Sequence, residues 1–243
     1  MNKISIEIKN LSKHYNNIEA VKNINFKINK GSIVGLLGPN GCGKTTTIGM
    51  MLGLIKPSSG AVFINDQNIE SEKNRTKILE KMNFISPYVE LPKKLTVEEN
   101  LKVYGKLYGV NNLQDKISDL MKQLNLFEFK KRKTGELSSG QKNRVSLAKA
   151  LINEPEILLL DEPTASLDPD VGDFIRTYLE DYASKKGATI LLASHNMNEV
   201  ERLCNEVMMM KNGKIIDKDT CKSLINKHGR KNLEETFLKI VRE

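Results

Sequence analysis

Three short apolar runs recur along the chain. They are "SIVGLLG" at 32–38, "EILLLDEP" at 156–163 and "ATILLASH" at 188–195. Each run is too short for a helix and too continuous for a strand with one solvated face. Such runs are typical of strands buried on both faces of a parallel sheet, and longer helical patterns separate them. The pattern therefore predicts an α/β fold with a mainly parallel sheet.

Alternating apolar and polar positions mark the N-terminal part of the chain. They occur in "ISIEIKNLSKHY", "AVKNINFKINKG" and "GAVFINDQNI", and indicate antiparallel strands. A later hairpin is predicted in "VMMMKNGKIID", where Asn212 and Gly213 form a two-residue turn signal. The run Met208–Met210 is expected to be strand core.

The remaining pattern predicts how the domain is divided. Residues of roughly 90–150 have helical spacing and no convincing strand, which favours a helical subdomain inserted between sheet strands. We expect one domain over residues 1–243. Its parts are an antiparallel β and phosphate-loop part (1–87), the helical subdomain (88–150), a second core part (151–220) and a short helical tail (221–243).

Composition narrows the class of protein. With 243 residues and 39% hydrophobic composition, the chain can bury a sizeable core. No apolar run approaches the roughly 18 residues that cross a bilayer, and the alternating N-terminus does not resemble a signal peptide. We therefore expect a soluble, cytosolic protein. The three cysteines and three histidines show no paired spacing, so neither a disulfide framework nor a structural metal site is expected.

The net charge of +8 raises the question of nucleic-acid binding. Only one dense basic run exists, "KKRK" at 130–133, and it has no interleaved aromatic residues. Lysines spread over solvated faces explain the charge better, so no nucleic-acid partner is expected. A nearby anionic membrane surface would also suit a basic protein.

The segment "GPNGCGKTT" fits the phosphate-loop (Walker A) pattern G-x-x-x-x-G-K-[ST]. Its residues are Gly38, Pro39, Asn40, Gly41, Cys42, Gly43, Lys44, Thr45 and Thr46. It follows a predicted strand and opens a helical pattern, which is the context that the motif needs. Backbone N–H groups and the helix N-terminus would hold phosphate, Lys44 would bridge the β- and γ-phosphates, and the Thr45 hydroxyl would bind Mg²⁺. A chance match arises in roughly one chain in a hundred, so ATP binding by a P-loop NTPase core is favoured. If the Cys42 thiol is exposed, alkylation should block that binding.

An acidic pair follows the second apolar run. Asp161 and Glu162 come at the carboxyl end of a buried strand, where ligands bind in open α/β sheets. Asp161 suits a Mg²⁺ role, and Glu162 is placed to polarise an attacking water. As isolated residues they would more simply cap a helix. Beside a phosphate loop they indicate ATP hydrolysis.

A further segment, "LSSGQKNRVSLAKALI" at 137–152, places a Ser-rich turn at the start of an amphipathic helix. Together with the phosphate loop, Asp161-Glu162, "ASLD" at 165–168 and "SH" at 194–195, it resembles the motif set of the ABC ATPases, in order and spacing. The resemblance covers essentially the whole chain.

The resemblance implies roles for further residues. The signature segment would contact the γ-phosphate of ATP held by the opposite subunit; it consists of Leu137, Ser138, Ser139, Gly140 and Gln141. Asp168 in the D-loop would cross the dimer interface, His195 would touch the γ-phosphate, and Tyr15 would stack on adenine. The alternatives are a core tyrosine and, for His195, a turn residue beside a helix that Asn196 and Glu199 cap. His14 and His228 are expected at the surface.

The sequence departs from the family in three places. Ser139 and Gln67 stand where glycine is commoner, although Asn65-Asp66 can supply the second turn. The loop "FISPYVELPKKLT" at 84–96 lacks the usual sensor glutamine, and Pro87 takes its position. Ser86 is the first candidate to contact Mg²⁺-bound water and Glu90 the second. Alternatively, Pro87 stiffens a hinge and His195 alone senses the γ-phosphate. Thr96 and Glu99 form a capping box for the next helix, which would face a membrane partner.

The resemblance also implies a function. ATP with Mg²⁺ would close a head-to-tail homodimer or heterodimer of ATPase subunits, and hydrolysis would reopen it. The dimer would sit on the cytoplasmic face of the cell membrane and drive a separate integral membrane permease. The tail "NLEETFLKIVRE" resembles ATPases of drug, polysaccharide or lipid exporters, which favours export. The alternative is a non-transport ABC ATPase of the iron–sulfur assembly type.

Overall fold

The structure is a computed structural model that describes residues 3–87, 89–165 and 167–242. The strands are β1 Ile4–Tyr15, β2 Ile18–Asn29, β3 Ile33–Leu37, β4 Ser59–Ile64, β5 Gln67–Asn68, β6 Met82–Ile85, β7 Ile157–Asp161, β8 Thr189–Ala193, β9 Glu206–Lys211 and β10 Lys214–Asp219. The helices are α1 Lys44–Met51, α2 Glu72–Leu79, α3 Val97–Leu107, α4 Leu113–Gln123, α5 Ser139–Leu151, α6 Pro169–Lys186, α7 Met197–Leu203, α8 Cys221–His228 and α9 Leu233–Arg242, with short 3₁₀ turns at Phe127–Phe129 and Thr134–Glu136.

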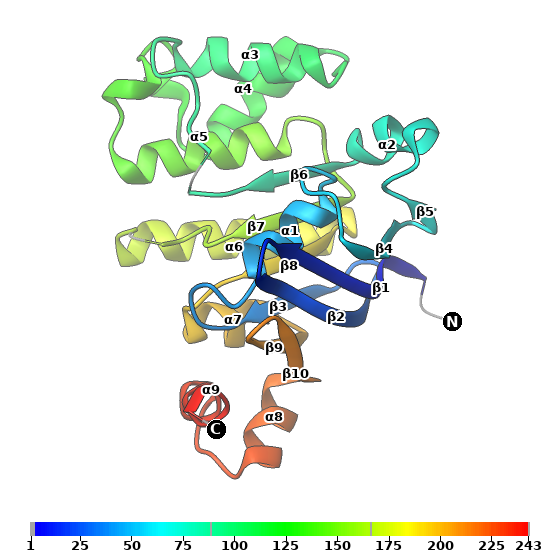
Figure 1. The fold of residues 1–243 in the computed structure, drawn as a ribbon. Helices are drawn as coiled ribbons and strands as arrows, with labels where there is room; N and C mark the ends of the chain where they lie inside the picture. Colours follow the sequence, from blue (N-terminus) through cyan, green and yellow to red (C-terminus); the bar gives the residue numbers. More distant parts are fainter. Residues whose placement is uncertain (1–2, 88, 166, 243) are drawn as a thin grey trace.

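A six-stranded sheet with the order β10-β9-β3-β8-β7-β6 forms the centre of the molecule, and the pairs from β9 to β6 are parallel (Figure 1). Strand β7 explains why the apolar runs are continuous. Leu158 and Leu160 enter the core on one face of the sheet, while Ile157 and Leu159 enter the core on the other. The predicted parallel sheet, buried on both faces, is confirmed.

The alternating N-terminal segments form a second, antiparallel sheet with the order β2-β1-β4-β5. The turn from β4 to β5 uses Asn65 and Asp66 in the left-handed conformation (φ 45° and 63°). The turn from β9 to β10 does the same with Asn212 and Gly213 (φ 49° and 80°). Asn, Asp and Gly adopt this conformation more readily than other residues, so both predicted turns form. The first turn forms although Gln67 stands where glycine is commoner. Met208–Met210 is buried, as expected of strand core.

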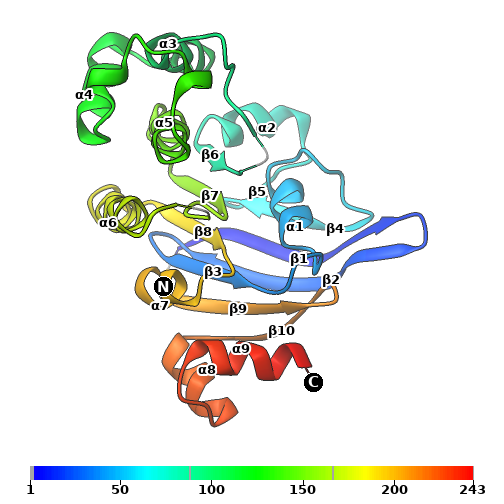
Figure 2. The same cartoon turned by 90° about the vertical axis from the view of Figure 1, so that its left-hand side faces the viewer.

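A helical lobe of α3, α4 and α5 lies at the β6 side of the large sheet, and α8 and α9 lie at the opposite end (Figures 1 and 2). The lobe is continuous with the main core, because Leu101, Ile117 and Val145 join the same cluster as Leu158. In the described part of the chain, no helix is both long and apolar enough to cross a membrane.

One histidine differs from expectation. His228 is not a plain surface residue: its side chain is only 17% exposed, and Nε2 lies 3.0 Å from the Asp217 carboxylate. The reason is that α8 folds back over β10, which carries Asp217. His14 is exposed, as expected.

Candidate functional site

The phosphate loop runs from the end of β3 to the start of α1, and its glycines sit where backbone comes close. A Cβ atom added at Gly38 would lie 2.3 Å from the Met210 carbonyl oxygen, and one at Gly43 would lie 2.5 Å from the Ala20 carbonyl oxygen. Gly43 also has φ 111°, a backbone conformation that residues with a Cβ atom rarely adopt. Both sheets therefore shape the loop.

Lys44 lies inside this loop and is only 6% exposed. Its Nζ donates to the carbonyl oxygens of Gly38 at 2.6 Å and Pro39 at 3.2 Å. The ammonium group is thus held at the mouth of the loop, close to the N-terminus of α1, where phosphate groups bind.

Cys42 does not face the loop opening. Its side chain is 3% exposed and belongs to the apolar core, and burial raises the pKa of its thiol. A buried, protonated thiol reacts slowly with alkylating agents, so the condition for alkylation sensitivity is not met. Cys42 can contribute only its backbone to nucleotide binding.

Thr45 and Asp161 form the oxygen-rich corner of the site. The Thr45 hydroxyl donates to the Asp161 carboxylate at 2.9 Å. Asp161 is 3% exposed, and burial raises its pKa while the Thr45 bond and the charge of Lys44 act in the opposite direction. A hydroxyl and a carboxylate beside a phosphate loop fit Mg²⁺, which prefers oxygen ligands and usually binds through few protein groups plus phosphate.

Glu162 and His195 meet at the carboxyl ends of neighbouring strands. Strand β7 ends just before Glu162 and β8 ends two residues before His195, so parallel pairing brings the two loops together. The Glu162 carboxylate lies 2.7 Å from His195 Nδ1, with side chains 17% and 65% exposed. Glu162 has φ 52°, and its N–H donates to the Ala193 carbonyl oxygen at 2.8 Å. Such strained backbone is typical of functional sites.

A pocket of about 250 Å³ lies beside Glu162, between the helical lobe and the sheet. Its lining includes Ser86, Pro87 and Glu90 of the loop after β6 and Ser139 at the start of α5. These two segments therefore meet next to Glu162. The Glu90 carboxylate is 2.7 Å from Lys93 Nζ and exposed. Tyr88, in the same loop, lies outside the described residues.

The signature segment opens α5 as a well-formed cap. The Ser138 hydroxyl accepts from Gln141 N–H at 3.3 Å, and the Gln141 side chain accepts from Ser138 N–H at 3.0 Å. Ser138 and Ser139 are exposed, while Leu137 is buried and Gly140 approaches Val171 of α6. Asp168, at the N-terminus of α6, is exposed, and Ser166 of the same D-loop segment lies outside the described residues.

Tyr15 ends β1 and its side chain is 44% exposed. Lys13 Nζ lies 5.0 Å from the centre of its ring. The ring is therefore accessible for stacking, and the interpretation of Tyr15 as a core residue is wrong.

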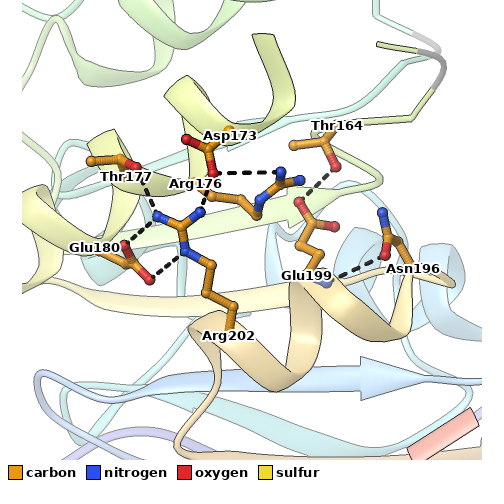
Figure 3. A network of polar contacts seen from close by, with 8 residues as sticks. All are labelled: Thr164, Asp173, Arg176, Thr177, Glu180, Asn196, Glu199 and Arg202. Carbon is orange, nitrogen blue, oxygen red and sulfur yellow. Dashed lines mark hydrogen bonds and ion pairs between the residues drawn. The ribbon is translucent and has the colours of Figure 1, made fainter. Parts of the chain in front are cut away.

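Sequence reasoning named Glu199 only as a capping residue and missed the contacts of its carboxylate near the site (Figure 3). The predicted cap is half right, because the Asn196 side chain accepts from Glu199 N–H at 3.3 Å. The Glu199 carboxylate, however, turns inward and accepts from Thr164 at 2.8 Å and Ser194 at 2.7 Å. The signal was its helical spacing with Leu203, four residues later on the buried face.

Lys149 is a second residue that the sequence did not single out. It is 7% exposed, and its Nζ donates to the Phe84 carbonyl oxygen at 3.0 Å, two residues before Ser86. Burial lowers its pKa to about 8. It connects α5 of the helical lobe to strand β6.

The parallel sheet, the phosphate loop after β3 and the carboxylates at the end of β7, on the far side of β8, define a P-loop nucleotide-binding ATPase. A sequence model of the family described as "ABC transporter" matches residues 21–165. The chain belongs to this family of ATP-binding cassettes.

Curated relatives agree. The chain is 37% identical over 227 residues to the methionine import ATP-binding protein MetN 1 of Bacillus anthracis, covering 90% of this chain and 66% of that protein. It is 33% identical over 229 residues to the ABC transporter ATP-binding protein NatA of Bacillus subtilis (strain 168), covering 93% and 92%. It is 33% identical over 231 residues to the Nod factor export ATP-binding protein I of Rhizobium sp. (strain N33), covering 94% and 75%.

Solved structures share the fold. An ATP-binding subunit of an ABC transporter superposes with a TM-score of 0.88 at 27% identity, covering 97% of this chain and 99% of that one. The cassette MJ0796, solved as a dimer in a post-hydrolysis state with ADP and Pi, gives 0.82 at 28% identity, covering 88% and 98%.

Proposed function

We propose that this chain is the ATP-hydrolysing subunit of a membrane transporter, acting with Mg²⁺ in a head-to-tail dimer. The observation that carries the proposal is the Glu162–His195 contact of 2.7 Å beside the Thr45–Asp161 pair. Glu162, His195 and the oxygens of Thr45 and Asp161 lie at one edge of the sheet, which supports their roles as base, γ-phosphate sensor and metal ligands. That arrangement suits phosphoryl transfer to water.

Each residue has a separate task in this proposal. Lys44 would exchange its two carbonyl partners for the β- and γ-phosphates, and Thr45 and Asp161 would hold Mg²⁺, which would neutralise phosphate charge. Glu162 orients and polarises the attacking water, and His195 contacts the γ-phosphate. Ser86 is the first candidate, and Glu90 the second, for the sensor role in the loop that has Pro87 in place of glutamine. The pocket that they share with Glu162 supports this assignment.

The signature residues act on the nucleotide of the opposite subunit. Ser138 and Ser139 are exposed at the positive end of α5, as a contact in trans requires. The dimeric MJ0796 structures support this arrangement. Homodimer and heterodimer are both compatible with it, and Asp168 would lie at the interface.

The transport partner is an integral membrane permease, and the chain is placed on the cytoplasmic face of the membrane. Transport names among the relatives support this role, and they give no support to iron–sulfur assembly. Export remains our proposed direction, supported by the Nod factor export ATPase, whereas MetN 1 is named for import. Sealed vesicles of the two orientations, assayed with the permease, decide between them.

Replacement of Glu162 tests the ATPase proposal. Glu162→Gln should bind ATP, accumulate as a dimer and lose turnover by at least about 100-fold, because the general base is removed while the phosphate loop stays intact. Phosphate release and light scattering with and without ATP measure the two effects.

A matched control is Glu156→Gln, which changes a carboxylate just before the other end of β7. It should keep wild-type turnover. Turnover by Glu162→Gln at the wild-type rate would refute the base assignment.

A further inference from the structure

Glu199 is a buried carboxylate between two loops of the site. It is 1% exposed, and each carboxylate oxygen accepts one hydroxyl hydrogen bond: Oε1 from Thr164 at 2.8 Å and Oε2 from Ser194 at 2.7 Å. Burial of a carboxylate without hydrogen-bond partners costs several kcal/mol, so Glu199 depends on its bonds to Thr164 and Ser194.

The two partners flank the catalytic candidates. Thr164 comes two residues after Glu162, in the turn that leaves β7, and Ser194 immediately precedes His195. The Ser194 hydroxyl also accepts from Asn196 N–H at 3.1 Å, so its own hydrogen is directed to Glu199. Glu199 thus joins both loops, and Figure 3 shows its bond to Thr164.

The groups around this carboxylate act on its charge in both directions. Burial raises the pKa of Glu199, the two hydroxyl bonds and the positive charge of Arg176 on α6 oppose this, the negative charge of Glu162 adds to it, and the net direction is upward. Helix α7 itself is fastened to α6, because Arg202 binds Glu180 at 3.0 Å, Thr177 at 2.7 Å and also Asp173 (Figure 3). The helix that carries Glu199 is therefore held to α6 by several contacts of its own, and such support suits a positioning group.

We propose that Glu199 is a positioning residue that ties the Glu162 loop to the His195 loop and so fixes the distance between base and γ-phosphate sensor. This rests on the roles proposed above for Glu162 and His195. A small displacement of either loop would misplace the attacking water, and such displacements reduce rates strongly.

The hydrogen-bond pattern makes the glutamine variant informative. In Glu199→Gln, the amide oxygen can accept from Ser194, and the amide nitrogen can donate to the Thr164 oxygen. Both bonds survive without the charge. In Glu199→Leu, which has a similar volume, both bonds are lost.

The experiment compares these variants by steady-state kinetics and by titration with a fluorescent ATP analogue. Glu199→Leu should lower kcat by about 10- to 100-fold, as loss of a supporting partner does elsewhere, with nucleotide affinity unchanged. Glu199→Gln should stay within about threefold of wild type, because both bonds remain. The matched control Glu201→Leu, an exposed position on the same helix, should keep wild-type kcat.

A second comparison shows whether the effect passes through His195. Ser194→Ala should lower kcat in the wild-type background. It should have little effect in the His195→Ala background, because the side chain that Ser194 helps to position is already missing there. This comparison also serves if Glu199→Leu does not fold.

The proposal is overturned if Glu199→Leu keeps wild-type kcat, if Glu199→Gln loses as much as Glu199→Leu, or if affinity and kcat fall in parallel. It is also overturned if Ser194→Ala acts equally in both backgrounds. Absence of ATP hydrolysis in the wild-type protein would instead refute the proposed function.

Discussion

Lys149 has an unusual position for a lysine. Its ammonium group is buried, donates to the Phe84 carbonyl oxygen, and lies 5.0 Å from the centre of the Phe84 ring and 5.6 Å from that of Tyr104. Burial lowers its pKa from 10.5 to about 8. The native state therefore releases this proton at a lower pH than the unfolded chain.

A pH dependence of stability follows. Between about pH 8 and pH 10.5 the unfolded state binds more protons at Lys149 than the native state, so its contribution to the free energy of unfolding rises with pH. The limit is about 3 kcal/mol, and the carbonyl and ring contacts, which favour the ammonium form, keep the gain below it. Lys149→Met should lack this contribution and be at least as stable as wild type at pH 7.

Urea unfolding of wild type and Lys149→Met at pH 7, 8.5 and 10 measures the effect as a difference between the two proteins. Lys106→Met, an exposed position on α3, is the control and should follow wild type. A constant difference between wild type and Lys149→Met across this range would contradict the argument.

Single residues also show where sequence reasoning stops. Asp161 and Glu162 could be assigned because they lie next to each other after a strand, in one recognisable motif. The role of Glu199 could not be assigned from the sequence. Its partner Thr164 lies 35 residues away along the chain, and strand pairing brings it close to Ser194 and Glu199. Burial of the Cys42 side chain likewise depends on residues far away in sequence.

At the scale of elements, α3 and α5 begin with the same device. In each, a hydroxyl accepts from the third residue and that residue's side chain returns to the cap: Thr96 with Glu99, and Ser138 with Gln141. Loss of such a cap typically costs about 1 kcal/mol.

The two caps should differ in function. Thr96→Ala and Ser138→Ala should each lower the free energy of unfolding by about 1 kcal/mol, but only Ser138→Ala should also weaken ATP-dependent dimerisation and turnover. Denaturant unfolding, light scattering and phosphate release separate these effects. Equal losses of activity in both variants would contradict a contact of Ser138 in trans.

Elements were predicted where their pattern is strong. The buried strands, both turns and the Thr96 cap were predictable because periodicity and turn chemistry are local. Strand β6 was not, because four residues show no usable period and its place beside β7 is set by parallel pairing.

At the scale of the whole molecule, a head-to-tail dimer makes a prediction by mixing. Lys44→Ala lacks a working phosphate loop, and Ser138→Glu places an acid where the signature would meet phosphate. Each variant alone should be inactive. In a mixed dimer, one site combines both faults and the other has neither.

An equal mixture should therefore recover roughly a quarter of wild-type turnover, since half of the dimers are mixed and each has one intact site. Mixing Lys44→Ala with Glu162→Gln is the matched control and should recover no turnover. Lys44 and Glu162 of one site come from the same subunit, so each site of a mixed dimer keeps one defect. No recovery in the first mixture would contradict a homodimer of this kind.

The phosphate loop also depends on parts of the chain that are made late. Its strand β3 has its neighbours in β8 and β9, the Met210 carbonyl oxygen lies against Gly38, and Gly213 N–H donates to the Cys42 carbonyl oxygen at 3.0 Å. During synthesis, the complete motif leaves the ribosome long before these supports exist. The nascent chain therefore contains the phosphate-loop motif before the loop can take its folded shape. It acquires affinity for ATP only when β9 and its turn have joined the sheet.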